Sequence, residues 1–217
     1  VVQVSSTAFN NEFRIAGMPP DGWVHADHPL SPTVEPVDQW GNRITTYDRA
    51  VVLTSDDSLA TVSPSTVTFG PSHAGILTLT NGVIFRTTKL TTLSISESTG
   101  IGYGQAQVNT APLSTFRFRV TGLPATLTAG TAASMTAEAL TPVGTRYTWY
   151  QGTVRSTSTD GRASLPADTT FTLADAGIRT FANAVVLKTA GTQSVTVEDQ
   201  ASLQDGVKMT GTQSGIA

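Results

Sequence analysis

The sequence repeats itself at an interval of about 100 residues, and this repeat limits the fold more than any other feature. Residues 13–19 read FRIAGMP and recur at residues 118–124 as FRVTGLP. Farther along, residues 55–57 (SDD) match residues 158–160 (STD). A module that recurs along one chain folds as the same unit each time, so the repeat predicts two homologous domains.

Each copy has the pattern of β-structure. Phe116, Phe118 and Val120 alternate with polar residues, which places the apolar side chains on one face of a strand. Gly, Pro, Asn and Asp interrupt such runs roughly every 8–12 residues, as in a sandwich of short strands. We therefore predict an all-β chain of two tandem immunoglobulin-like β-sandwich domains with a short N-terminal strand-like arm.

The predicted arm covers residues 1–12, the first domain residues 13–111 and the second domain residues 112–217. Pro112 lies in the short linker between the domains, where its missing N–H costs no sheet bond. Alternation and residue type predict the following core for the second domain: Phe118, Val120, Met135, Trp149, Val154, Leu165, Phe171, Phe181, Leu187, Val195 and Val197.

The surface of these domains carries little charge. Lys, Arg, Asp and Glu make up 13% of the 217 residues, against roughly 25% in an average soluble protein, whereas the chain has 37 Thr and 19 Ser. Its net charge is −3, and its 13 basic residues are scattered. We expect no nucleic-acid partner, because binding to a phosphate backbone needs clustered Lys and Arg. We also expect no membrane insertion, because no apolar run reaches the ~20 residues of a membrane span.

The chain has no cysteine, which fits a secreted bacterial or archaeal protein that does without disulfides and leaves a cytosolic origin open. It begins at Val1 without a charged and then apolar leader, which we interpret as a processed or excised product. Together with the neutral β-surfaces, these features predict an extracellular or cell-surface location.

Two runs in the second copy carry a resemblance to a known family. Residues 165–177 read LPADTTFTLADAG, and residues 187–197 read LKTAGTQSVTV. Both resemble the signature of a bacterial immunoglobulin-like repeat, which occurs in tandem in large secreted or surface-anchored proteins and is similar to invasin-type and adhesin-stalk domains. The first copy departs from it, with VSPS at residues 62–65 and RTTK at residues 86–89. The resemblance implies a fold that serves spacing and display, and no shared ligand.

His25, Asp27 and His28 are the clearest candidates for a metal site. Two imidazoles and one carboxylate within four residues offer nitrogen and oxygen ligands that suit zinc or copper. The corresponding stretch of the second copy, residues 127–131, reads LTAGT, so the repeated fold does not need these side chains. We expect a solvated loop and no bound metal, with the metal site as the alternative.

Asp56, Asp57 and Asp160 are candidates for a calcium site between loops. Calcium takes six to eight oxygen ligands and usually several carboxylates together, but the chain has no Asp-x-Asp-x-Asp run. We interpret these residues as turn residues.

Motifs for covalent or cofactor chemistry are absent from the sequence. Without Cys, a nucleophile would be Ser or Thr beside a His, and the second copy contains no His. No P-loop, dinucleotide fingerprint or Gly-x-Ser-x-Gly elbow is present. A carboxylate pair for glycoside hydrolysis stays open as an alternative. We predict a protein that is not an enzyme and has no cofactor.

Aromatic residues offer a second kind of site. Trp40 lies in the expected turn at residues 38–42, where it would be exposed and could stack on a surface glycan or pack against a neighbouring subunit. Trp149, Tyr47 and Tyr150 fit core or corner positions instead.

The N-terminal arm has its own apolar alternation, since Val2 and Val4 flank Gln3. Three interpretations stay open: the last strand of a preceding domain, a strand folded back onto its own sheet, or a strand that completes the sheet of a neighbouring molecule. The sequence as a whole predicts a structural or adhesive surface module whose partners are identical subunits or neighbouring immunoglobulin-like domains. The alternative is a carbohydrate-binding module that uses exposed aromatic residues.

Overall fold

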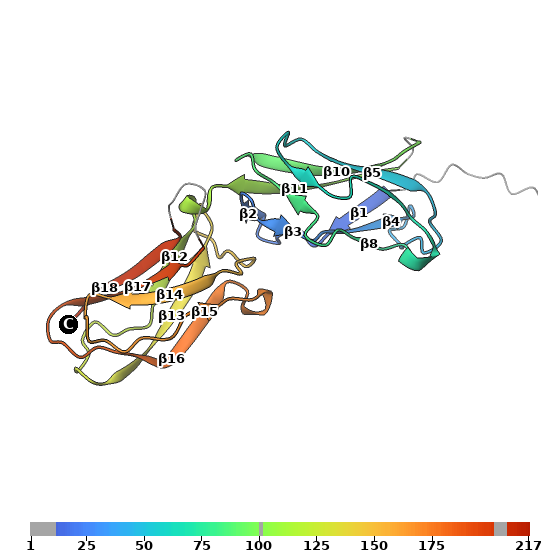
Figure 1. The fold of residues 1–217 in the computed structure, drawn as a ribbon. Coiled ribbons are helices and arrows are strands. Elements are labelled where there is room, and N and C mark those ends of the chain that lie inside the picture. Colours follow the sequence, from blue (N-terminus) through green and yellow to red (C-terminus); the bar gives the residue numbers. More distant parts are fainter. Residues whose placement is uncertain (1–11, 100–101, 202–207) are drawn as a thin grey trace, which may run out of the picture. The chain divides into compact units, whose positions relative to one another are not determined.

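The computed structural model describes residues 12–99, 102–201 and 208–217 (Figure 1). The chain divides into two compact units, Val1–Thr110 (unit 1) and Ala111–Ala217 (unit 2). The predicted all-β fold is confirmed, because the only helices in the described ranges are three single 3-10 turns. These turns are η1 (Pro71–His73), η2 (Leu113–Thr115) and η3 (Leu173–Asp175).

Unit 2 is a sandwich of two antiparallel sheets. One sheet has the strand order β12-β13-β16 and the other β15-β14-β17-β18, which is an immunoglobulin-like division of seven strands. The strands are β12 (Arg117–Thr121), β13 (Ala132–Leu140), β14 (Thr153–Ser158), β15 (Thr169–Thr170), β16 (Ile178–Val186), β17 (Gln193–Asp199) and β18 (Thr210–Ile216).

Unit 1 has the same arrangement with more interruptions. The halves β7-β5-β10-β11 and β1-β4-β8 are joined by parallel pairing of β1 with β11, strand β2 also pairs with β11, and a small sheet β3-β9-β6 lies beside them. The strands are β1 (Glu12–Ala16), β2 (Trp23–His25), β3 (Pro29–Leu30), β4 (Thr33–Val37), β5 (Ala50–Ser55), β6 (Thr61–Val62), β7 (Thr66–Thr68), β8 (Leu77–Thr78), β9 (Val83–Ile84), β10 (Leu90–Glu97) and β11 (Tyr103–Ala111).

The two cores contain the same aromatic contact. In β1 the ring of Phe13 meets Tyr47 edge-on at 5.6 Å between centroids, and in β12 the ring of Phe118 meets Tyr150 edge-on at 5.2 Å. All four side chains are buried. Burial of a large apolar side chain stabilises a fold by about 2–3 kcal/mol, so this repeated contact is a main anchor of each sandwich.

A glycine in the last strand of each unit lets the first strand pass closely. A Cβ on Gly104 would overlap the carbonyl oxygen of Phe13, and a Cβ on Gly211 would overlap that of Phe118. Any larger residue would push the first and last strands apart. The glycine therefore belongs to the repeated pattern because of this close approach.

The core predicted for the second domain is right except at two positions. Trp149 and Leu165 are only half-buried, whereas the other nine predicted residues are buried. Trp149 lies in the loop between β13 and β14, where the neighbouring Tyr147 and Tyr150 fill the interior and leave no room for an indole.

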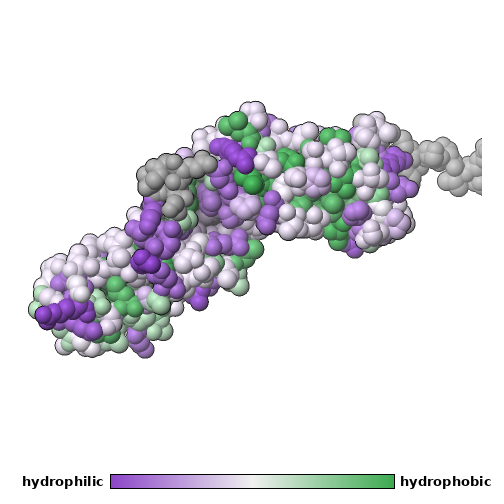
Figure 2. Space-filling model, viewed as in Figure 1, coloured by the Kyte–Doolittle hydropathy of each residue, from purple (hydrophilic) through white to green (hydrophobic). Residues whose placement is uncertain are grey.

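The outer faces carry the neutral residues that the composition predicts. On the face drawn in Figure 2, residues of intermediate hydropathy cover much of the surface between separate apolar and hydrophilic patches. Exposed Thr–Thr pairs are part of the neutral surface of unit 2: the hydroxyls of Thr136 and Thr180 lie 3.0 Å apart across neighbouring strands, and those of Thr196 and Thr212 lie 2.8 Å apart. Such cross-strand pairs stabilise a sheet without charge.

Candidate functional site

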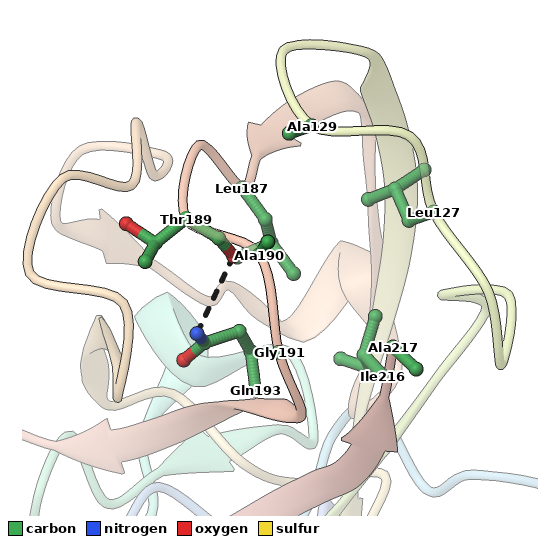
Figure 3. A pocket seen from close by; sticks show the side chains of 9 residues that line it. All are labelled: Leu127, Ala129, Leu187, Thr189, Ala190, Gly191, Gln193, Ile216 and Ala217. Carbon is green, nitrogen blue, oxygen red and sulfur yellow. Dashed lines mark hydrogen bonds between the residues drawn. The ribbon is translucent and has the colours of Figure 1, made fainter.

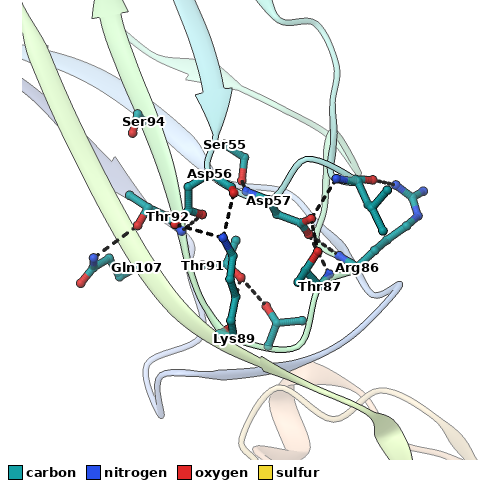
Figure 4. Close-up of polar contacts among 12 residues, drawn as sticks. Ser55, Asp56, Asp57, Arg86, Thr87, Lys89, Thr91, Thr92, Ser94 and Gln107 are labelled. Carbon is teal, nitrogen blue, oxygen red and sulfur yellow. Dashed lines mark hydrogen bonds and ion pairs between the residues drawn. The ribbon is translucent and has the colours of Figure 1, made fainter.

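Asp57 follows strand β5 and ties two loops of unit 1 together (Figure 4). One carboxylate oxygen accepts hydrogen bonds from the amides of Arg86 (2.6 Å) and Thr87 (2.9 Å). The other accepts from the Leu59 amide (2.9 Å) and the Thr87 hydroxyl (2.5 Å). The Ser55 hydroxyl in turn accepts from the Asp57 amide at 3.0 Å. Both carboxylate oxygens of Asp57 therefore have hydrogen-bond partners within unit 1.

Asp160 repeats this arrangement in unit 2. Its carboxylate accepts from the amides of Lys188 (2.6 Å), Thr189 (3.0 Å) and Arg162 (2.9 Å) and from the Thr189 hydroxyl (2.7 Å). The Lys188 amide contributes most to lowering the pKa of Asp160 well below its usual range. For Asp57, burial opposes ionisation, but the bonds from Thr87 and the other amides outweigh it and also lower the pKa.

We call these two arrangements the aspartate clamps, centred on Asp57 and Asp160. Buried carboxylates that satisfy orphan backbone amides hold loops in place. The turn interpretation of Asp57 and Asp160 agrees with the structure. Calcium would have to compete with four hydrogen bonds at each carboxylate.

A second buried acid in each unit meets the core tyrosine. In unit 1 the Tyr47 hydroxyl donates to Glu97 (3.1 Å), and Arg49 pairs with the same carboxylate at 2.9 Å. In unit 2 the Tyr150 hydroxyl donates to Asp199 at 2.8 Å. Burial, followed by the adjacent carboxylate, raises the pKa of both tyrosines above the usual range. The tyrosines therefore stay neutral donors and anchor the ends of strands β10 and β17.

The candidate metal ligands of unit 1 lie close together but are engaged separately. The rings of His25 and His28 meet edge-on with centroids 4.7 Å apart. Asp27 forms an ion pair with Arg86 at 3.1 Å. Burial, with a smaller contribution from His25, lowers the pKa of His28 to about 4. The neutral imidazole of His28 could bind a metal ion. The carboxylate of Asp27, however, is already paired with Arg86.

Across residues 12–99, 102–201 and 208–217, no group of three or more His, Asp or Glu side chains is placed to hold a metal ion. Within the same part of the chain, no helix has the length and apolar character needed to cross a membrane.

Trp40 stands out from its turn, with 75% of its surface exposed. The Asp38 carboxylate fixes this turn by accepting from the amides of Trp40 and Asn42, each at 2.9 Å, and Gly41 takes a φ of 82°. An open pocket of about 480 Å³ adjoins the turn. It is lined by Asp38, Arg43, Ile44, Thr45, Thr46, Tyr47, Asp48 and Arg49.

A smaller pocket of about 140 Å³ lies at one end of unit 2 (Figure 3). Leu127, Leu187 and Ile216 face the same hollow, and Ala190 and Gly191 lie at its rim. The Gln193 side-chain amide donates to the Thr189 carbonyl at 3.4 Å across one side. No charged residue lines it. The pocket is therefore largely apolar, with backbone atoms at its edge.

The candidate contact residues Val2 and Val4 belong to residues 1–11, which lie outside the described residues. The arm therefore stays a prediction from the sequence.

Sequence reasoning missed the partners of the clamps. Thr87 and Thr189 each follow a basic residue at the same place in the repeat. This recurring pair of a basic residue and a threonine was the sequence signal that could have identified them as partners of the two aspartates. Glu97 and Asp199 were missed because one copy has a glutamate and the other a shorter aspartate. This difference in side-chain length hides the role that the two carboxylates share.

The chain matches no protein-family model and no curated protein. Among solved structures it is similar to the D0-D1 domains of intimin, at 14% identity over 94% of this chain and 97% of that chain, with a TM-score of 0.35. It is also similar to the S-layer protein SbsC, domains 4 and 5, at 12% identity over 92% and 96%, with a TM-score of 0.37.

A third similar structure is invasin, described as a bacterial integrin-binding protein, at 17% identity over 91% of this chain and 38% of that chain, with a TM-score of 0.31. The function proposed below rests on the chain's own residues.

Proposed function

We propose that the chain is a non-catalytic, extracellular module with a structural or adhesive role, a building block of a surface protein, fibre or filamentous appendage. The observation that carries this proposal is the repeated use of acidic side chains for the fold. Asp57 and Asp160 hold loops, while Glu97 and Asp199 hold tyrosines, in the same way in both units. These four carboxylates, which are the kind of group that acid–base catalysis uses, therefore already form hydrogen bonds that stabilise the fold.

The mechanism is mechanical. Each sandwich buries a compact core, and the aspartate clamps hold loops that would otherwise open. A chain built this way resists local unfolding, because loops tied through buried hydrogen bonds share the stability of the core. The neutral Thr-rich faces stay soluble without attracting nucleic acid or strongly charged surfaces.

We infer that partners are identical subunits or neighbouring immunoglobulin-like domains, reached through end-to-end contacts or through strand donation by the arm that carries Val2 and Val4. Donation would supply backbone bonds to a sheet edge and bury the apolar side of the arm. The arm has the required alternation.

Labelling of intact cells that produce the protein tests the surface role. An antibody against the chain should bind before the cells are permeabilised, and external protease should remove the signal. Labelling that requires permeabilisation would overturn the proposal. A cytosolic protein released by lysis serves as the control for cell integrity.

A carbohydrate-binding role is the second candidate, favoured by the exposed Trp40 beside the open pocket that contains Arg43 and Asp48. An aromatic face with polar neighbours suits a sugar ring. Glycan-array binding that is lost in Trp40→Ala and kept in Val143→Ala would favour this role. Val143 is the matched control, because it takes the same place in the corresponding turn and is also exposed.

A further inference from the structure

The open pocket of unit 1 lies in the loop between β4 and β5, whose backbone follows the same course as the loop between β13 and β14 of unit 2. The Ile44 amide donates to the Pro36 carbonyl at 2.9 Å, and the Tyr147 amide donates to the Ala139 carbonyl at 2.8 Å. An isolated bridge closes each loop at the same spacing. Each residue of one loop therefore has a counterpart in the other, and differences between the loops lie in their side chains.

Two large aromatic side chains of unit 2 are replaced by smaller ones in the loop of unit 1. Tyr147 is fully buried, with its ring centroid 4.6 Å from that of Phe116, and its counterpart in unit 1 is Ile44. Trp149 is half-buried, and its counterpart is Thr46. Ile44 and Thr46 both line the pocket of about 480 Å³. The space that the aromatic rings take up in unit 2 is thus open to a ligand in unit 1.

The same loop contains an arginine that unit 2 uses for its fold. In unit 2, Nε of Arg146 pairs with the Glu138 carboxylate at 2.8 Å. In unit 1 the corresponding Glu35 pairs with Arg14. Arg43, the counterpart of Arg146, forms no ion pair with a carboxylate of the described ranges and lines the pocket. Its guanidinium is therefore available to a ligand.

The charges around the pocket favour a ligand without net charge. The Asp38 carboxylate accepts from amides of its own turn, and Arg49 pairs with Glu97. Arg43 and Asp48 also line the pocket, and neither forms an ion pair within the described part of the chain. The two aspartates disfavour an anion, and the two arginines disfavour a cation. The pocket thus offers strong hydrogen-bond donors and acceptors side by side.

A pyranose ring has the chemistry that matches these groups. Neighbouring hydroxyls of the ring donate to a carboxylate and accept from a guanidinium at the same time. Trp40, which is exposed in the same turn, adds an aromatic face on which the C–H groups of a sugar pack. An apolar surface beside a few polar groups that fix orientation is typical of small-ligand sites.

We propose that the pocket within residues 38–49 of unit 1 binds a neutral pyranose residue of a glycan, with Arg43 and Asp48 on neighbouring hydroxyls and Trp40 against the carbon face. The inference rests on the adhesive side of the proposed function and on its carbohydrate-binding candidate. It names the class of sugar and the side chains that select it, and it assigns binding to unit 1 alone.

Saturation-transfer NMR of the full 217-residue chain tests the ligand class. The probes are the methyl glycosides of glucose, galactose and mannose, with methyl glucuronide as the acidic counterpart. At least one neutral glycoside should receive magnetisation from the protein, and the acidic probe should receive less.

Thr46→Trp tests the place of binding, because it restores the residue type of unit 2 and refills the pocket. The transfer to neutral glycosides should be lost. Thr66→Trp is the matched control, since Thr66 is an exposed threonine of the same unit that does not line the pocket, and the transfer should be unchanged. Far-UV circular dichroism confirms that each variant is folded.

Arg43→Gln and Asp48→Asn test the polar contacts. Each removes a charged hydrogen-bond partner of the sugar, so the Kd of the neutral glycoside should rise by roughly tenfold or more. Arg162→Gln, at an exposed arginine of unit 2, is the control and should leave the Kd unchanged.

Stronger binding of methyl glucuronide than of every neutral glycoside would overturn the inference, and so would neutral binding that survives Thr46→Trp. Binding that is lost in Trp40→Ala and kept in Thr46→Trp would remove the pocket and leave the carbohydrate-binding role. A chain that binds none of the probes and no glycan of an array would remove both. Labelling of intact cells reports the surface role independently of any sugar.

Discussion

Unit 1 and unit 2 share their internal bonds and differ at their periphery. Both have an aspartate clamp, a buried tyrosine–carboxylate bond and an Arg–Glu pair between the first strand and its antiparallel neighbour, Arg14–Glu35 on β1 and β4 and Arg119–Glu138 on β12 and β13. They differ in side chains that the fold does not require. His25 and His28 of unit 1 correspond to Thr128 and Thr131 in unit 2, and Trp40 corresponds to Val143.

This difference separates the groups that make the fold from the groups that are free to serve a function. A side chain present in both copies with the same partners is explained by stability. A side chain or an open pocket that is present in only one copy can form specific contacts with a partner. By this criterion the histidine pair and Trp40 are the features that distinguish unit 1 from unit 2.

Removal of an aspartate clamp should have the largest effect, and it should be equal in the two units. Asp57→Ala and Asp160→Ala each leave buried amides without an acceptor, so we expect a loss of about 3 kcal/mol in the free energy of unfolding. Hydrogen exchange read separately for the amides of each unit measures it. Asp57→Ala should weaken unit 1, and Asp160→Ala should weaken unit 2.

Asp168→Ala is the control for these variants. Asp168 pairs with Arg155 on the surface, where both side chains are exposed. Its loss should cost no more than about 0.5 kcal/mol. Clamp variants that cost as little as this control would contradict the role given to the clamps.

The tyrosine variants should show a smaller effect that differs between the units. Tyr150→Phe leaves the carboxylate oxygen of Asp199 that accepted the hydroxyl without that donor, at a cost of about 2 kcal/mol. Tyr47→Phe should cost only about 1 kcal/mol, because Arg49 still pairs with Glu97. Urea denaturation of the two variants measures the difference. Equal losses would show that Arg49 contributes nothing.

The pH dependence of stability should be comparable in size to the effect of Tyr150→Phe and specific to unit 1. The pKa of His28 is lowered to about 4 in the fold, against about 6.5 in the unfolded chain. Between these values the unfolded state binds more protons, so the stability of unit 1 falls as pH drops from about 6.5 to about 4, by on the order of 2 kcal/mol.

Replacement of His28 by the residue of the other copy, His28→Thr, should remove this dependence. The hydrogen exchange of unit 1 at pH 7 and pH 4.5 reports it, with unit 2 as the internal control. A slope that persists in His28→Thr would assign the effect to another group.

The sequence was sufficient to predict the class of fold and its repetition. Alternation in residues 116–120 is a local signal, and it predicted strands correctly, while the recurrence of FRIAGMP as FRVTGLP is the signal from which the two units were predicted. The position of Trp149 was not predictable in this way. Whether an indole enters the core depends on the space left by Tyr147 and Tyr150, which is a property of packing in three dimensions.

The site features were predictable only in part. Exposure of Trp40 followed from its turn residues. The pocket of unit 2 had no sequence signal, because Leu127, Leu187 and Ile216 are far apart in the sequence and meet only in the folded unit.

Electron microscopy of the purified full chain, imaged across a range of concentrations, tests most directly the claim that it is a building block. The account predicts rows of chains joined end to end, with a repeat of one chain. Separate particles at every concentration, together with glycan binding that is lost in Trp40→Ala, would contradict it and favour the carbohydrate-binding module.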